Sequence, residues 1–244
     1  VSVMAVNNET GVITDLVAVS KLVRRYAPQA MLHTDAVQAA CWLDLRTIWP
    51  LVDTMALSAH KFGGPKGVGI LVVREGKFFE PIVLGGGQER DRRSGTHNVG
   101  GIVAAAEALR ITDIERSSEV ARIGALRDKL FAGLLAIEGA HRTIPAEYSV
   151  PGVVHVCLQG IESESLLYLL DEADVCASAA SACASGAMEP SHVLAAMGLT
   201  SDLTMGALRL SLGHTTTEVD VDRAIEAITD AVNRIRAVQN RRSL

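Results

Sequence analysis

The sequence has no excess of positive charge and no long run of apolar residues. Its 23 basic side chains are set against 28 acidic ones, and the formal net charge is −5. This balance offers no electrostatic footprint for nucleic acid or for an anionic membrane surface. No apolar stretch approaches the roughly 18 residues that a membrane-spanning helix needs. We therefore expect neither direct nucleic-acid binding nor insertion into a membrane.

Cysteine is also scarce. The four cysteines show neither the CxxC pairs of a zinc site nor the density of a disulfide scaffold. The sequence therefore predicts no metal site, and it favours a reducing, cytoplasmic setting. Hydrophobic residues make up 48% of the chain, which excludes wholesale disorder. What remains is a globular chain of 244 residues, long enough for one to two domains.

The first hundred residues alternate short apolar runs with a helical pattern. Apolar residues recur at helical spacing between Asp15 and Pro28, which predicts a helix over 16–26. The apolar runs predict four strands, at residues 2–6, 30–34, 54–59 and 68–74. Strands and helices in this order are typical of an α/β fold with a largely parallel sheet.

After residue 84 the pattern changes and predicts a second, smaller α/β region. The expected helices cover residues 98–111, 114–138, 162–172 and 219–238, and the expected strands cover 153–158 and 208–212. Because this second half has its own pattern of strands and helices, we place a domain boundary near residue 112. We therefore expect one domain over residues 1–112 and another over 113–244.

Polar side chains follow three of the predicted strands. Asn8, Asp35 and the run from Ser58 to Lys61 each lie just beyond a strand's carboxyl end, where open α/β sheets bind ligands. Taken singly, Asp35 is also typical of a helix cap or turn, and Lys61 of a solvated lysine in a glycine-rich turn. If the strands are neighbours, these groups converge on one site.

Pyridoxal phosphate needs this set of groups. It requires a lysine amine that can form a Schiff base and an acid that holds its ring nitrogen protonated. It also needs donors for its phosphate and its phenolic oxygen. The candidates are Lys61 for the amine, Asp35 for the ring nitrogen, Ser58 and His60 for the phosphate, and Asn8 and Gln38 for the phenolic oxygen.

A stretch of very small residues, 177–187, carries one thiol, Cys183. One interpretation is an Ala-rich helix in which Cys183 is a small buried hydrophobe. The serines within the stretch favour a mobile loop instead. A thiol on such a loop is what a travelling nucleophile requires. The other three cysteines lie within or beside apolar segments, and we interpret them as structural.

Eight motifs, in order along nearly the whole chain, resemble the cysteine desulfurases, in the group that includes the nitrogen-fixation and iron–sulfur housekeeping enzymes. They are VNNETG at 6–11, HTDAVQ at 33–38, SAHKFGGPKG at 58–67, GGGQER at 85–90, RSGT at 93–96, SAC at 181–183, EPSHVL at 189–194 and LRLSLG at 208–213. The resemblance implies a fold-type I, pyridoxal-phosphate-dependent transferase. Residues 1–112 would be the C-terminal portion of its cofactor-binding large domain. Residues 113–244 would be its small domain, which carries the mobile cysteine loop.

The resemblance also implies roles for single residues. Lys61 would carry the cofactor and move the substrate's α-proton, and His60 would serve both catalysis and cofactor binding. Thr96 would reach the phosphate across a dimer interface. Arg209 would hold the substrate carboxylate, and Cys183 would accept the sulfur. The assignments of Asn8, Asp35, Gln38 and Ser58 to the cofactor stay as given above.

The implied activity is conversion of L-cysteine to L-alanine, with a persulfide passed from Cys183 to an iron–sulfur scaffold or another sulfur-acceptor protein. A homodimer is expected, because Thr96 would complete the partner's site. The family has a glycine where this chain has Ala180, which could slow the loop. It also has residues before the VNNETG motif that are absent here, including the histidine that stacks on the cofactor.

Two alternatives stay open. The chain could be a truncated, catalytically incomplete fragment that acts as a dimerisation or partner-binding module. It could also be a related fold-type I aminotransferase or lyase that shares Lys61 and Asp35 and needs no thiol; the position of Cys183 argues against this reading.

Overall fold

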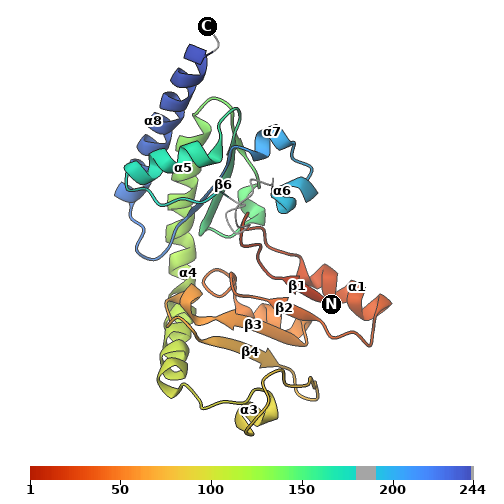
Figure 1. Ribbon diagram of the computed structural model, residues 1–244. Helices are drawn as coiled ribbons and strands as arrows, with labels where there is room; N and C mark the ends of the chain where they lie inside the picture. Colours follow the sequence, from red (N-terminus) through yellow and green to blue (C-terminus); the bar gives the residue numbers. More distant parts are fainter. Residues whose placement is uncertain (180–190, 243–244) are drawn as a thin grey trace. The chain divides into compact units, whose positions relative to one another are not determined.

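The computed structural model describes residues 1–179 and 191–242, and its backbone divides into two compact units (Figure 1). Unit 1 comprises Val1–Val6 and Thr14–Ser117, and unit 2 comprises Asn7–Ile13 and Ser118–Leu244. The short segment Asn7–Ile13 therefore belongs with residues far along the chain.

Unit 1 contains a four-stranded sheet in the order β1-β2-β3-β4. The strands are β1 Ser2–Met4, β2 His33–Asp35, β3 Thr54–Ser58 and β4 Gly69–Val73. The first three are parallel, and Met4, Asp35 and Ala56 share one register position. β4 pairs antiparallel with β3, since the connection over residues 59–68 is too short for a crossover. Three of the predicted strands are present with slightly shorter bounds, and the second lies at 33–35 where 30–34 was predicted; the mostly parallel α/β fold is confirmed.

A capping side chain marks the start of the first helix of unit 1. In α1, Leu16–Tyr26, the Asp15 carboxylate accepts a hydrogen bond from the Ala18 N–H at 2.9 Å, and the bounds are those predicted. Leu16 and Val23 form its buried stripe. The remaining helical elements are short: α2 Leu45–Ile48, α3 Gln88–Asp91 and the 3₁₀ turns η1 Trp49–Leu51 and η2 Ala59–Phe62.

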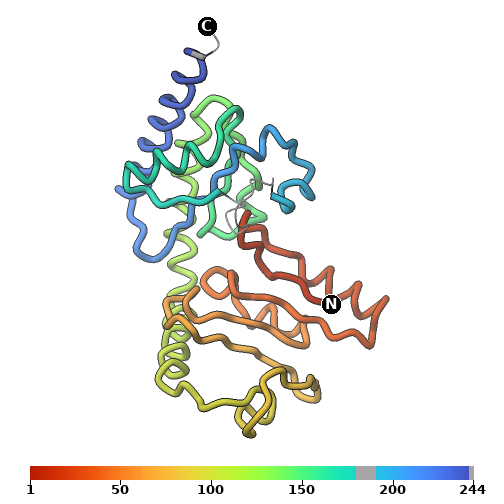
Figure 2. The backbone as a smooth tube through the Cα atoms, in the orientation of Figure 1, coloured from red at the N-terminus to blue at the C-terminus, as the bar shows by residue number. Residues whose placement is uncertain are grey.

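A single helix, α4, runs from Val99 to Leu135, whereas two helices were predicted over 98–111 and 114–138. Figure 2 shows its coil continuing without a break. The two polar residues at the expected break, Thr112 and Asp113, both find partners while remaining helical. Thr112 Oγ1 donates to the Phe62 carbonyl at 3.2 Å, and Asp113 forms an ion pair with Arg116 at 2.9 Å. With no proline there and these partners present, nothing ends the helix. The expected domain boundary at residue 112 thus falls inside α4, and the two compact units part at Ser117.

Unit 2 contains a three-stranded antiparallel sheet, β5-β6-β7, with β6 in the centre. The strands are β5 Ala140–Arg142, β6 Val153–Leu158 and β7 Ala207–Ser211. Every residue of β6 is buried. The helices are α5 Ser163–Glu172, α6 His192–Ala196, α7 Ser201–Thr204 and α8 Glu218–Arg242, with a 3₁₀ turn η3 at Ala146–Tyr148. α5 packs against α8, while Leu194 of α6 packs with Cys157 and Ala207.

The segment Asn7–Ile13 is tied to this sheet by backbone bonds. Ile13 N–H donates to the Tyr148 carbonyl at 2.9 Å, and Val150 N–H donates to the Gly11 carbonyl at 3.0 Å. Gly11 has φ +75°, and a Cβ there would lie 2.8 Å from Val153 Cβ. Glycine is therefore required for the segment to lie this close to β6.

No helix among residues 1–179 and 191–242 is both long enough and apolar enough to cross a membrane.

Candidate active site

The carboxyl ends of β2 and β3 bring two predicted site residues to one edge of the unit 1 sheet. Asp35 is the last residue of β2, and Ser58 is the last residue of the neighbouring parallel strand β3. Asp35 Oδ1 accepts a hydrogen bond from the Val37 N–H at 2.9 Å, which fixes the carboxylate at the strand end. The expectation that these strands are neighbours is correct.

The end of β3 and the turn that follows it present a hydroxyl, an imidazole and an amine. Ser58 Oγ and His60 Nδ1 are hydrogen bonded at 2.8 Å. His60 and Lys61 lie in η2 and are both exposed. Gly63 ends this turn with φ +79°, and Gly64 packs so close to Ala59 that a Cβ would lie 2.9 Å from the Ala59 Cβ. The two glycines thus let the chain fold back tightly beside the lysine.

The backbone of Lys61 is held by a hydrogen bond, while its amine has no acidic partner among the described residues. The Cys41 thiol donates to the Lys61 carbonyl at 3.2 Å. Burial raises the pKa of Cys41, with a smaller opposing effect from Arg116, so this thiol keeps its proton and serves as a donor. Within the described part of the chain, no carboxylate lies within ion-pair distance of Lys61. The amine is therefore available to a ligand.

Two further predicted residues lie in unit 1. Gln38 is half-buried in the turn that follows Asp35. Thr96 is exposed, in the connection between α3 and α4. The structure gives neither side chain a hydrogen-bond partner among the described residues, so their assigned roles stay predictions.

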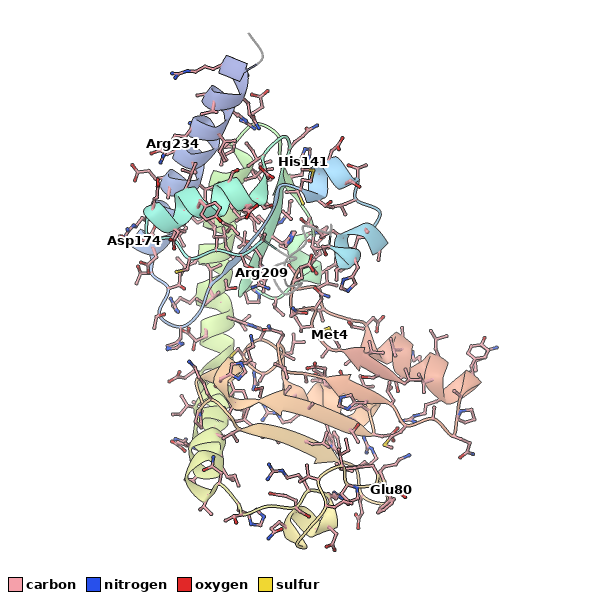
Figure 3. The ribbon with its side chains drawn as sticks, viewed as in Figure 1. Met4, Glu80, His141, Asp174, Arg209 and Arg234 are labelled. Atoms are coloured by element: carbon pink, nitrogen blue, oxygen red, sulfur yellow. The ribbon has the colours of Figure 1, made fainter. Side chains whose placement is uncertain are left out.

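Unit 2 holds Asn8 and Arg209. Arg209 lies on β7, labelled in Figure 3, and its Nη1 donates to the Asn8 carbonyl at 3.1 Å. The backbone of Arg209 also pairs with Ser178, through bonds of 2.8 and 3.1 Å. A guanidinium that is hydrogen bonded to a neutral carbonyl group keeps its charge for an anionic ligand. Asn8, expected beside Asp35, is thus part of unit 2 and bonded to Arg209.

The interior of unit 2 holds polar residues that the sequence analysis did not single out. His155 lies in the middle of β6, is only 2% exposed and is directly opposite Arg209. Glu9 is buried as well, and Ser191 Oγ donates a short hydrogen bond to its Oε1. The sequence did contain a signal for His155, because a histidine within the otherwise apolar run VVHVCL indicates a buried polar side chain.

Cys183 and Ala180 lie outside the described residues, so the predicted sulfur acceptor and its loop stay predictions. The three described cysteines are free thiols; Cys157 is buried and Cys176 is exposed.

Known proteins that resemble this chain are named cysteine desulfurase. The chain is 39% identical over 239 residues to a cysteine desulfurase of Trichormus azollae, covering 98% of this chain and 59% of that protein. It is 41% identical to cysteine desulfurase IscS of Pasteurella multocida, covering 97% of this chain and 58% of that protein. The chain therefore spans about three fifths of the length of these curated relatives.

Solved structures of similar fold include a NifS-like protein with a TM-score of 0.85 and 38% identity, covering 95% of this chain and 60% of that one. DndA from Streptomyces lividans matches with a TM-score of 0.69 and 34% identity, covering 86% of this chain and 59% of that one. The α/β architecture is therefore that of fold-type I pyridoxal-phosphate enzymes. The model of the aminotransferase class-V family matches residues 1–224. The chain belongs to the aminotransferase class-V family.

Proposed function

We propose that the protein is a pyridoxal-phosphate-dependent cysteine desulfurase that converts L-cysteine to L-alanine and leaves the sulfur on Cys183. The observation that carries this proposal is the edge formed by β2 and β3. There a carboxylate ends one strand and a serine ends its parallel neighbour, and a histidine and an exposed lysine lie in the turn that follows the serine. Relatives that are named cysteine desulfurase match nearly the whole of this chain, and they support a desulfurase reaction at this site.

The donor set at this edge fits the cofactor. Asp35 would hold the ring nitrogen protonated, and the Ser58–His60 pair would bind the phosphate. Gln38 and Asn8 would serve the phenolic oxygen, and Thr96 the phosphate from a second copy of the chain. When bound, pyridoxal phosphate supplies an electron sink for negative charge at the substrate α-carbon.

The chain's own residues then divide the remaining work. The Lys61 amine moves the substrate α-proton, because no acid neutralises it in the described structure. Arg209 binds the substrate carboxylate through its guanidinium. The Cys183 sulfur forms a bond to the substrate sulfur while the substrate Cβ–S bond breaks. The electron pair of the broken bond stays with Cβ, which takes up a proton, so that alanine is released and Cys183 keeps the persulfide.

We also infer a homodimer. Large apolar side chains that flank Thr96 in sequence are exposed in unit 1, with exposed fractions of 97% for Ile82, 78% for Leu84 and 64% for Val99. Large apolar side chains that are this exposed favour burial against a second copy of the chain. The persulfide would pass to an iron–sulfur scaffold or another sulfur-acceptor protein, and the free thiols favour a cytoplasmic, reducing setting.

The proposed sulfur acceptor is tested by replacing Cys183. We expect the Cys183→Ala protein to lose alanine formation from L-cysteine, measured without added thiol. The matched control is Cys176→Ala, since Cys176 is an exposed free thiol seven residues before Cys183 in the sequence. Alanine release at the wild-type rate from Cys183→Ala would overturn the proposal and favour a fold-type I enzyme that needs no thiol.

The proposed cofactor lysine is tested by borohydride reduction followed by mass spectrometry. We expect wild-type protein to gain a covalent pyridoxyl adduct, which Lys61→Ala loses and Lys66→Ala keeps, because Lys66 lies in the same glycine-rich turn. No adduct on the wild-type protein would instead favour a non-catalytic partner-binding module.

A further inference from the structure

His155 is a buried imidazole with one nitrogen in use. Its Nδ1 is hydrogen bonded to Thr143 Oγ1 at 2.7 Å. Its Nε2 is buried and has no partner within the described residues. A buried polar atom without a partner costs free energy and calls for an explanation.

The sheet register places His155 beside Arg209. The two residues are direct partners across the antiparallel strands β6 and β7, so their side chains leave the same face of the sheet. Directly opposite side chains have Cβ atoms about 5 Å apart. The side chains that carry the unpartnered imidazole nitrogen and the guanidinium therefore lie next to each other on this face of the sheet.

The imidazole is neutral in this setting. Burial, together with the positive charge of Arg209, lowers the pKa of His155 to about 4. Among the described residues, further titratable groups on this face of unit 2 include Cys157 on β6, His141 on β5 and Glu9 of the segment Asn7–Ile13. Burial raises the pKa of Cys157, so its thiol is uncharged too.

The hydrogen bonds fit a tautomer with a bare Nε2. The Thr143 hydroxyl lies 2.7 Å from His155 Nδ1 and 3.8 Å from Cys157 Sγ. When this hydroxyl donates to the sulfur, it accepts from Nδ1–H, and Nε2 is left with a lone pair. A lone pair is the group that a neighbouring guanidinium, which has only N–H donors, can use.

We propose that His155 is a positioning residue that orients the Arg209 guanidinium for the carboxylate of an amino-acid substrate. In this role the bare Nε2 of His155 accepts from the guanidinium when the substrate binds, and a neutral acceptor of this kind leaves the charge of Arg209 uncancelled, as the Asn8 carbonyl already does. Among the described residues no carboxylate forms an ion pair with Arg209; Glu9, the acid of this face, is bonded to Ser191. Arg209 thus keeps its full charge for the ligand.

This inference rests on the proposed function and is tested on the holoenzyme with paired substitutions. His155→Asn keeps a group near the Nδ1 position and removes Nε2, whereas His155→Gln can place an amide oxygen near the Nε2 position. We expect His155→Asn to raise KM for L-cysteine on the order of 10-fold with little change in kcat, and His155→Gln to restore most of the loss. His141→Asn, the same change at an exposed site on β5, is the control.

A second measurement separates this inference from the proposed function. Calorimetry with 3-mercaptopropionate, a carboxylate without the amine, reports the anion site without turnover. We expect about 10-fold weaker binding to His155→Asn than to wild type. Equal binding, or a loss that His155→Gln does not repair, would overturn the positioning role. Absence of alanine formation by wild type, with the binding difference intact, would overturn the desulfurase proposal alone.

Discussion

Asp53 is the best-paired buried carboxylate of unit 1. It accepts from the Leu32 N–H at 2.8 Å and forms ion pairs with Arg24 at 2.9 Å and Lys77 at 3.2 Å. Burial acts to raise the pKa of Asp53, but these donors outweigh it and hold the pKa below its ordinary value. The carboxylate thus ties the start of β2 to α1 and to the chain after β4.

Asp53→Asn should destabilise unit 1 by about 2 kcal/mol at pH 7, because two cations lose a charged acceptor. A lowered carboxyl pKa contributes stability above the unfolded value near 3.9 and loses it as pH falls through the folded value. The deficit of the variant should therefore shrink below about pH 4. Urea unfolding followed by tryptophan fluorescence measures this, since both tryptophans, Trp42 and Trp49, lie in unit 1.

Glu80→Gln is the control for Asp53→Asn. It removes one negative charge from an exposed side chain of unit 1, labelled in Figure 3, that has no ion pair in the described structure. A constant deficit for Asp53→Asn from pH 7 to pH 3 would show that packing, and not charge, explains the loss.

At the scale of single elements, local signals sufficed where capping and periodicity agreed. α1 was predicted to the residue, because Asp15 caps it and Pro28 follows it. β6 was predicted as precisely, because the run VVHVCL is apolar except for His155, and a mostly apolar run of this length marks a strand buried on both faces. The prediction wrongly divided α4 into two helices, because Thr112 and Asp113 are polar residues typical of a helix break. In the structure Thr112 donates to the Phe62 carbonyl and Asp113 pairs with Arg116, and the helix continues. Those partners depend on tertiary structure, which the local pattern does not contain.

The residues of the candidate site also fall into those that the sequence predicted and those that it did not. Asp35 and Lys61 were identifiable because each follows a strand end, a position that the sequence displays directly. His155 was missed because its significance depends on register: Arg209, 54 residues away in the numbering, becomes its neighbour only when β6 and β7 pair. Cross-strand pairing of this kind is set by the whole sheet.

The contact of α4 with α8 provides a prediction for two glycines on one helix. A Cβ at Gly133 would lie 2.5 Å from Ile225 Cδ1 and 2.7 Å from its Cγ1, and a β-branched side chain in a helix has little freedom to move away. Gly133→Ala should therefore destabilise unit 2 by about 1–3 kcal/mol through overpacking. Gly124 has no neighbour within 4 Å, so Gly124→Ala should stabilise the helix by up to about 1 kcal/mol.

Urea unfolding followed by far-ultraviolet circular dichroism compares these two variants. Opposite signs are expected from the same chemical change. Two variants of equal stability would show that α8 can shift away from Gly133 without loss.

At the scale of the whole molecule, the two units should respond differently to acid. His155 has a pKa of about 4 in the folded protein and about 6.5 when unfolded. Between these values the unfolded chain binds the additional proton, so the stability that neutral His155 contributes is present above pH 6.5 and is lost as pH falls towards 4. The difference corresponds to about 3 kcal/mol.

Because His155 lies in unit 2, this loss belongs to β5–β7 and not to the sheet of unit 1. Hydrogen exchange measured by mass spectrometry at pH 7 and pH 5 resolves the two sheets. Relative to His155→Gln, which has no titrating ring, wild type should lose protection in β6 and β7 at pH 5 while β2 and β3 behave alike in both proteins. Equal losses in both sheets would mean that acid unfolds the two units together. No difference between the proteins would mean that the imidazole is charged in the folded state, and a charged ring could not accept a hydrogen bond from Arg209.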